Sequence, residues 1–188
     1  MKLIMISGGV RSGKSKFAEE LATRCAAGSP VLYVATGRSY DAEMQQRIEA
    51  HQGRRPSHWG CIEAADSLVG SVRHYNAYST VLVDTMSARI GNVLMSAPET
   101  KLRSQAITAA IQQEMQQWIV QLQTVTAAKE AKTETVIVVT DEAGLGGVAM
   151  TPLGRWFQDV VGDANQAVAA AADEVYFVVS GLPWRVKG

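Results

Sequence analysis

The stretch that decides the fold is Gly8-Gly9-Val10-Arg11-Ser12-Gly13-Lys14-Ser15. It fits the pattern G-x-x-x-x-G-K-[ST], between an apolar run and a segment of helical period. Glycines let the backbone curl until successive N–H groups point at phosphate oxygens, and the helix N-terminus adds positive potential. We therefore expect Gly8 to Ser15 to bind nucleotide phosphates, with Lys14 on the β- and γ-phosphates and Ser15 on Mg²⁺. A chance glycine-rich turn is the alternative, and the flanking strand and helix disfavour it.

Five short apolar runs punctuate the chain and predict its strands. They are Lys2–Ile6, Pro30–Ala35, Thr80–Asp84, Thr135–Thr140 and Glu174–Ser180. Continuous apolar strands are expected where helices cover both faces of a parallel sheet. Strands that alternate with helical segments imply right-handed crossovers. We expect an α/β fold, a three-layer P-loop NTPase of RecA-like type, with a mostly parallel central sheet and helices on both faces. No linker composition interrupts residues 1–188, so one nucleotide-binding and transferase domain is expected.

Apolar residues with a period of three to four predict five helices. These helices run from Lys14 to Cys25, from Asp41 to Pro56, from Met86 to Leu94, from Glu99 to Lys129 and from Thr151 to Val168. Thr151-Pro152 is a favourable N-cap and N1 pair for the last of them. In the longest helix the inward positions are expected to be Leu102, Ala106, Ala110, Met115, Trp118 and Leu122.

The composition is that of a globular protein and excludes several function classes. The chain has 188 residues, 47% of them apolar, and its 18 Lys+Arg balance its 18 Asp+Glu. Zero net charge argues against electrostatic binding of nucleic acid or anionic lipid. No apolar run is long enough to span a membrane, and the opening run lacks a cleavage site. Cys25 and Cys61 have no metal-ligand spacing and are expected to be ordinary thiols. A cytoplasmic protein is expected.

Two acidic strand ends complete the expected nucleotide site. Asp84 ends a buried apolar strand, where a Mg²⁺ ligand is expected beside Ser15. The alternative is that Asp84 only caps the helix near Met86. Asp141-Glu142 ends a later strand and is a further candidate, or else a solvated strand end. The guanine-reading motif Asn-Lys-x-Asp is missing, which disfavours a regulatory GTPase. These residues predict a Mg²⁺-dependent nucleoside triphosphate enzyme with an unnamed acceptor.

A second cluster of reactive residues lies between the second and third predicted strands. Arg47 and His51 are four residues apart and are therefore neighbours on a helix surface, with Arg54 and Arg55 one turn further on. A neutral histidine ringed by arginines can attack phosphorus while the arginines hold the phosphates. Periodicity by itself favours the other interpretation, a surface histidine with solvated arginines.

The chain resembles the bifunctional adenosylcobinamide kinase / adenosylcobinamide-phosphate guanylyltransferase family of cobalamin biosynthesis. The most specific match is Glu-Met-x-x-Arg-Ile-x-x-His from Glu43 to His51, followed by Arg55-Pro56 and Trp59. Further matches run nearly end to end: Gly8 to Ser15, Phe17-Ala18-Glu19, Tyr33 to Gly37, Asp41, Glu63, Val83-Asp84, Asn92, Glu142, Gly144, Gly146, Phe157, Asp159, Gly162, Asn165-Gln166, Ala172 to Val175 and Ser180-Gly181.

The resemblance implies two reactions in one fold. ATP or GTP would phosphorylate the aminopropanol hydroxyl of adenosylcobinamide, and GMP from GTP would then be transferred through a guanylyl-histidine. His51 aligns with that histidine, and Lys14 serves the kinase step. Positions that align with the family's GTP contacts are Gly8 to Ser15, Ala35, Thr36, Gly37, Gln52, Gly53, Arg54, Arg55, Glu63 and Asp84. The resemblance also implies Mg²⁺, held by Ser15 and Asp84, a corrinoid partner and a homo-oligomer.

The chain departs from the family pattern after its fourth predicted strand. Asp141 stands where Asn is common, Val148-Ala149-Met150 replaces Ile-Val-Pro, and Gln158 replaces an arginine. These changes bear on the kinase step or on corrinoid handling. Trp118, Trp156 and Trp184 are expected to pack in the protein and not to form a corrinoid platform. Two alternatives stay open: a P-loop kinase of another small alcohol, and a RecA-like nucleotide-binding module without group transfer.

Overall fold

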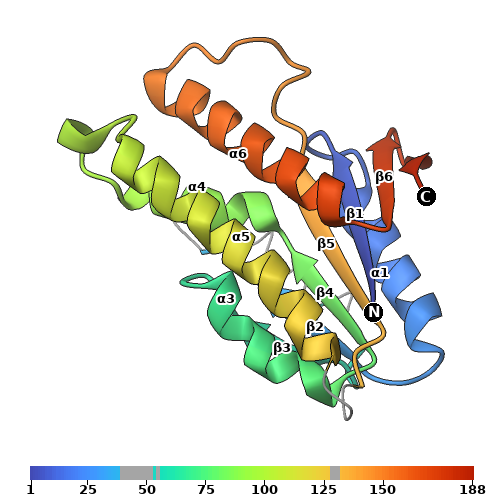
Figure 1. Ribbon diagram of the computed structural model, residues 1–188. Helices are drawn as coiled ribbons and strands as arrows, with labels where there is room; N and C mark the ends of the chain where they lie inside the picture. Colours follow the sequence, from blue (N-terminus) through green and yellow to red (C-terminus); the bar gives the residue numbers. More distant parts are fainter. Residues whose placement is uncertain (39–52, 54–55, 128–131) are drawn as a thin grey trace.

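A seven-stranded sheet organises the computed structural model, which describes residues 1–38, 53, 56–127 and 132–188 (Figure 1). The strands lie in the order β3-β2-β4-β5-β1-β6-β7. Six strands are parallel, and β7 runs antiparallel to β6. Their bounds are β1 Lys2–Gly8, β2 Val31–Ala35, β3 Gly60–Glu63, β4 Thr80–Asp84, β5 Thr135–Asp141, β6 Glu174–Val179 and β7 Leu182–Lys187.

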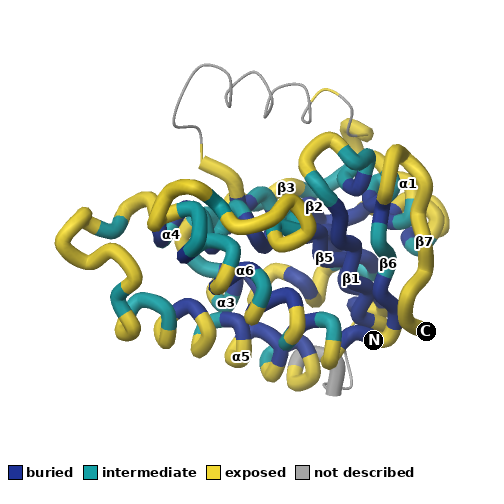
Figure 2. Tube along the Cα trace, turned by 90° about the horizontal axis from the view of Figure 1, so that it is seen from above, coloured by how far each residue is buried: buried dark blue, intermediate teal, exposed yellow. Residues whose placement is uncertain are grey.

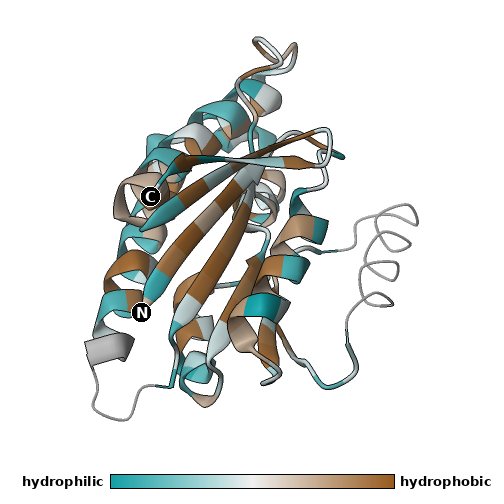
Figure 3. Ribbon diagram, turned by 90° about the vertical axis from the view of Figure 1, so that its right-hand side faces the viewer, coloured by the Kyte–Doolittle hydropathy of each residue, from teal (hydrophilic) through white to brown (hydrophobic). Residues whose placement is uncertain are grey.

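Helices cover both faces of the sheet and give the three layers that the sequence predicts. They are α1 Lys14–Ala26, α3 Leu68–Ser71, η1 Val72–Ala77, α4 Met86–Ser96, η2 Glu99–Lys101, α5 Gln105–Ala127 and α6 Pro152–Ala171. Ile4 and Ile6 pack under α1, whereas Leu3 and Met5 join the larger core under α4, α5 and α6. Figure 3 shows the largely hydrophobic strands, in brown, between the helices on the two sides of the sheet. Because successive side chains point to opposite faces, both sets must be apolar, and β1 has a continuous apolar sequence.

The five predicted strands are confirmed to within about two residues, and two more were not predicted. β3 has four residues, half-buried or exposed, and β7 is exposed along its whole length. Neither carries the apolar run that burial on both faces would require. α3 and η1 were also not predicted. The expected helix from Asp41 to Pro56 falls largely outside the described residues.

The longest helix differs from the prediction at its start and in its inward face. Glu99–Lys101 forms a separate 3-10 turn, Arg103 has a φ of 59°, and α5 begins only at Gln105. Leu102, Ala106 and Ala110 are exposed, so their inward assignment was wrong. Met115, Trp118 and Leu122 are buried as expected, together with Ile111 and Ile119, so Ala106 and Ala110 lie one position away from the face that α5 turns to the core.

The last helix follows the sequence more closely. Thr151 caps α6 by accepting a hydrogen bond from the Gly154 N–H, and Trp156, Val160, Ala164 and Val168 are buried as expected. None of the helices in the described ranges is both long and apolar enough to cross a membrane.

Glu174 ties the edge hairpin β6–β7 to the first strand. Its carboxylate accepts hydrogen bonds from Lys2 Nζ at 2.5 Å, Arg185 Nη2 at 2.7 Å and the Tyr176 hydroxyl at 2.9 Å. The hydrogen bond from Lys2 lowers the pKa of Glu174 more than burial raises it. Burial and the bond to Glu174 raise the pKa of Tyr176. A hydrogen-bonded carboxylate therefore holds β1, β6 and β7 together.

Candidate functional site

The carboxyl ends of the parallel strands bring the predicted site residues to one edge of the sheet. Ala35 lies opposite Glu63 on β3 and opposite Asp84 on β4, and Gly8 lies opposite Asp141 on β5. Parallel strands share one direction, so residues far apart in sequence meet at their ends. Ligands of open α/β sheets bind outside this edge.

The phosphate loop curls tightly between β1 and α1. A Cβ on Gly8 would lie 2.6 Å from both Ser12 Oγ and the Val178 carbonyl oxygen, and Gly13 has a φ of 94°. Both positions therefore require glycine. The Gly181 N–H donates to the Ser12 carbonyl at 2.8 Å, which attaches the β6–β7 turn to the loop. The loop adopts the compact form that the motif predicts.

Lys14 places its ammonium group over this loop. It is 8% exposed, and its Nζ lies 2.6 Å from Asp141 Oδ1 and donates to the Gly9 carbonyl at 3.2 Å. The other carboxylate oxygen of Asp141 accepts from Ser87 Oγ at 2.6 Å. The structure thus brings Asp141 into the site, and the interpretation of Asp141 as a solvated strand end is wrong.

Ser15 and Asp84 form the second half of the site. Ser15 Oγ donates to Asp84 Oδ1 at 3.4 Å, and the Tyr33 hydroxyl donates to Asp84 Oδ2 at 2.8 Å. Hydroxyl and carboxylate oxygens are the donors that Mg²⁺ prefers, so this pair fits the ion. The described residues hold no group of three His, Cys, Asp or Glu side chains suited to a metal. A Mg²⁺ ion here would therefore need phosphate and water oxygens as further ligands.

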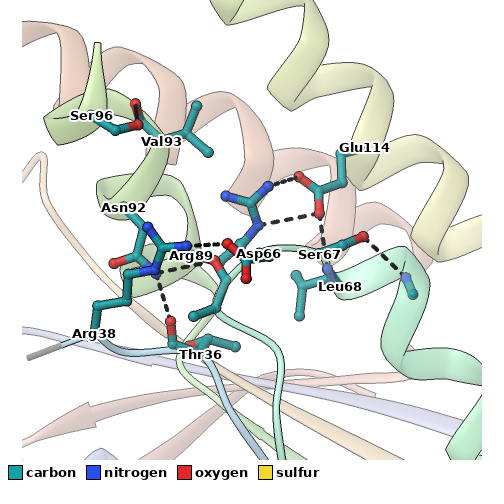
Figure 4. Close-up of polar contacts among 12 residues, drawn as sticks. Thr36, Arg38, Asp66, Ser67, Leu68, Arg89, Asn92, Val93, Ser96 and Glu114 are labelled. Carbon is teal, nitrogen blue, oxygen red and sulfur yellow. Dashed lines mark hydrogen bonds and ion pairs between the residues drawn. The ribbon is translucent and has the colours of Figure 1, made fainter.

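Asn92 on α4 positions the segment after β2. Its Nδ2 donates to the Thr36 carbonyl at 2.8 Å and to the Ala65 carbonyl at 3.3 Å, as Figure 4 shows for Thr36. The buried Thr36 hydroxyl donates to the Thr85 carbonyl at 2.5 Å. The side chain of Thr36 therefore serves the fold, while Gly37 beside it is exposed. That Ala35, Thr36 and Gly37 contact a nucleotide stays a prediction.

A hollow of about 220 Å³ lies beside Glu63, the last residue of β3. Its wall is held by a two-fold ion pair between Arg89 and Glu114, at 2.8 and 3.3 Å, and by the Leu68 N–H on Glu114 at 2.9 Å (Figure 4). Both side chains are at most 15% exposed. Arg38 and Asp66 pair nearer the solvent. Glu63 is exposed here, and its nucleotide contact stays a prediction.

The residues expected to take part in guanylyl transfer lie mostly outside the described part of the chain. His51, Gln52, Arg54 and Arg55 lie outside the described residues, and only the exposed Gly53 lies within them. Their roles stay predictions.

The sequence analysis did not identify two hydroxyl groups that hold the site's acids, nor the contacts that Gln158 makes. Tyr33 and Ser87 hold Asp84 and Asp141, but a hydroxyl in a strand or a first helical turn carries no signal of its own. Gln158, which the sequence analysis named only as a departure from the family pattern, accepts from the Ala149 N–H and donates to the carbonyls of Ala143 and Gly147. It therefore shapes the loop between β5 and α6. Trp118 and Trp156 are buried as predicted, but Trp184 is 68% exposed and the packing prediction for it was wrong.

Comparison with known proteins places this geometry in one family. The family model described as cobinamide kinase / cobinamide phosphate guanyltransferase matches residues 4–186. The chain belongs to this family. The relatives include bifunctional adenosylcobalamin biosynthesis protein CobU of Escherichia coli, 36% identical over 98% of this chain and 99% of its own. Protein CobP of Pseudomonas aeruginosa, with the same description, is 33% identical over 98% of this chain and 96% of its own.

The family membership agrees with the fold of solved structures. An ATPase from a type III secretion system aligns with a TM-score of 0.56 and 11% identity, covering 98% of this chain and 56% of that one. At this identity the likeness shows the P-loop NTPase fold alone. The predicted fold class and the resemblance to the family are both confirmed.

Proposed function

We propose that the chain phosphorylates adenosylcobinamide with ATP or GTP and then transfers GMP from GTP to the phosphate, giving adenosylcobinamide-GDP. The observation that carries the proposal is the convergence of Lys14, Ser15, Asp84 and Asp141 at one sheet edge, in a chain of this family. The curated relatives named above bear the description of bifunctional adenosylcobalamin biosynthesis proteins.

In the kinase step an alcohol oxygen attacks the γ-phosphorus. The bond from that phosphorus to the β–γ bridging oxygen breaks, the nucleoside diphosphate leaves, and the hydroxyl loses its proton to solvent or to a nearby base. Lys14 would neutralise charge on the β- and γ-phosphates, because its ammonium lies over the loop. The N–H groups of Gly9 to Gly13 would hold the remaining phosphate oxygens.

In the transferase step a neutral imidazole nitrogen of His51 attacks the α-phosphorus of GTP. The α–β phosphoanhydride bond breaks and pyrophosphate leaves, forming a phosphoramidate. A phosphate oxygen of the phosphorylated acceptor then attacks the same phosphorus, and the P–N bond breaks with proton return to the imidazole. Gln52, Gly53, Arg54 and Arg55 would hold the GTP phosphates, and Ala35 to Gly37, Glu63 and Asp84 would complete the nucleotide contacts.

Ser15 and Asp84 would hold the Mg²⁺ ion. When bound, the ion neutralises phosphate charge and orients the polyphosphate. The partly buried Tyr33–Asp84 hydrogen bond fixes the carboxylate in the direction of Ser15. We also propose that residues 1–188 act as one domain within a homo-oligomer.

Labelled GTP tests the proposal. With Mg²⁺ and GTP labelled at the α-phosphate, the protein should retain label at His51, and His51→Ala should retain none. The phosphoramidate should be labile in acid and stable in base. Label retained only from the γ-position refutes the guanylyl-histidine.

A pair of variants separates the two steps. His51→Ala should keep kinase activity on adenosylcobinamide, whereas Lys14→Ala should lose it. Equal loss of the kinase in both variants refutes the division of roles. Steady phosphate release without any acceptor would instead indicate a nucleotide-driven module.

A further inference from the structure

A pocket beside the phosphate loop is not explained by nucleotide binding. It has a volume of about 410 Å³ and lies between α6, the β5–α6 loop and the β6–β7 hairpin. We call it the hairpin pocket; its lining includes Ser7, Leu145, Asn165, Phe177, Trp184 and Val186. Figure 2 shows β7 exposed at the edge of the sheet, beyond α6.

The floor of the hairpin pocket is one row of residues across three strands. Ser7 on β1 pairs with Phe177 on β6, and Phe177 pairs with Trp184 on β7. Residues paired across strands point to the same face, so the two aromatic side chains stand beside each other on this floor. Trp184 is 68% exposed, and Leu145, which also lines the pocket, is 77% exposed. A cluster of exposed large apolar side chains beside a catalytic edge marks a binding surface.

Ser7 supplies an independent sign of a ligand. The residue is 6% exposed, lines the pocket, and its Oγ has no hydrogen-bond partner among the described residues. A buried hydroxyl without a partner costs free energy unless something bonds it. A ligand on the floor with a polar edge toward β1 would satisfy this hydroxyl.

The hairpin pocket is joined directly to the phosphate loop. Ser7 precedes Gly8 in the chain, the Glu142 N–H donates to the Gly8 carbonyl at 3.0 Å, and Gly181 bonds Ser12. Glu142, which also lines the hairpin pocket, directly follows Asp141, the partner of Lys14, so a ligand in the pocket lies next to this part of the phosphate site. The acceptor of a phosphoryl transfer must occupy such a position.

We infer that the hairpin pocket binds the corrinoid ring of the acceptor, with one ring face against Trp184 and Phe177 and an amide of the rim on Ser7. The inference rests on the proposed function, which supplies the substrate class. A flat macrocycle with apolar faces and amide groups on its rim matches an aromatic floor that ends in an unsatisfied hydroxyl. The open pocket takes one face of so large a ring and does not enclose it.

Equilibrium dialysis with dicyanocobinamide, read by its visible absorbance, tests the inference. Trp184→Ala should weaken corrinoid binding about tenfold or more, while Trp184→Phe should retain most of it. Ser7→Ala should weaken binding about fivefold without loss of thermal stability, since the hydroxyl has no partner among the described residues. Binding of GTP should be unchanged in all three. Val120→Ala, at an exposed apolar position on α5, is the control and should bind both ligands normally.

Each outcome decides between the pocket and the proposed function. If the unaltered protein phosphorylates adenosylcobinamide and both Trp184→Ala and Ser7→Ala bind dicyanocobinamide normally, the pocket assignment is overturned and the function stands. A change of oligomeric state in Trp184→Ala with normal corrinoid binding also overturns it, in favour of a subunit contact. If the unaltered protein neither binds nor phosphorylates the corrinoid, the proposed function fails and the assignment fails with it.

Discussion

Replacement of Asp141 by asparagine should tighten nucleotide binding. Asp141 Oδ1 lies 2.6 Å from Lys14 Nζ, and the two side chains are 30% and 10% exposed. The phosphates of a bound nucleotide and the Asp141 carboxylate would compete for the same ammonium group. Asparagine keeps an oxygen to accept from Ser87 but loses the charge.

The size of the effect follows from the geometry of this pair. A hydrogen bond to a charged group contributes about 1.5–3 kcal/mol, and partial exposure of Asp141 reduces this to about 1–2 kcal/mol. If phosphate displaces Asp141 from Lys14, the variant gains that amount on binding, which is about 5- to 30-fold in affinity. Without nucleotide the variant should be less stable by a similar amount, because Lys14 is buried without its counter-charge.

Calorimetric titration with a non-hydrolysable Mg·GTP analogue measures the affinity, and urea unfolding without nucleotide measures the stability. Asp159→Asn is the matched control, since Asp159 pairs with Arg103 at 2.7 Å with both side chains about half exposed. It should change neither quantity measurably. An unchanged or weaker affinity in Asp141→Asn would refute the competition and show that Lys14 bonds Asp141 and phosphate together.

Three more predictions rest on the described contacts. In the same titration, Asp84→Asn should weaken Mg²⁺-dependent nucleotide binding at least tenfold, because it loses a charged oxygen suited to the ion. Tyr33→Phe should weaken it about fivefold, because the Tyr33 hydroxyl orients the carboxylate. If Mg²⁺ strengthened nucleotide binding equally in Asp84→Asn and in the unaltered protein, the role of Asp84 would be contradicted. Glu114→Ala should lower the free energy of unfolding in urea by about 3 kcal/mol, because it leaves Arg89 buried without its partner; a loss below about 1 kcal/mol would show that solvent replaces the carboxylate. The lowered pKa of Glu174 stabilises the folded protein above the unfolded carboxyl's pKa of about 4.3, so the stability advantage over Glu174→Gln should be full at pH 6 and disappear as the pH falls below 4.3. If the difference in stability between the unaltered protein and Glu174→Gln stayed constant down to about pH 3, the hydrogen bond from Lys2 would not shift this pKa.

The sequence by itself predicted the features that depend on local chemistry. A phosphate loop was predicted from Gly8, Gly13, Lys14 and Ser15, because its backbone geometry needs these residue types in this order. The buried strands were predicted from continuous apolar runs, because helices on both faces of the sheet leave no polar positions along them. The helix cap at Thr151-Pro152 was predicted for the same reason, since all its partners lie within four residues.

The tertiary structure decided what depends on partners distant in the chain. Asp141 was an ambiguous strand end until β5 placed it beside β1, where Lys14 reaches it. Trp184 seemed a packing residue because nothing near it in sequence shows that β7 is an uncovered edge strand. The predicted helix start at Glu99 was wrong because Glu99–Lys101 forms a separate 3-10 turn and Arg103, with a φ of 59°, interrupts the helix before Gln105. The order of the strands and the positions of the covering helices decide which of these residues meet and which stay exposed. Packing across the whole sheet fixes this arrangement, and no local stretch of sequence does.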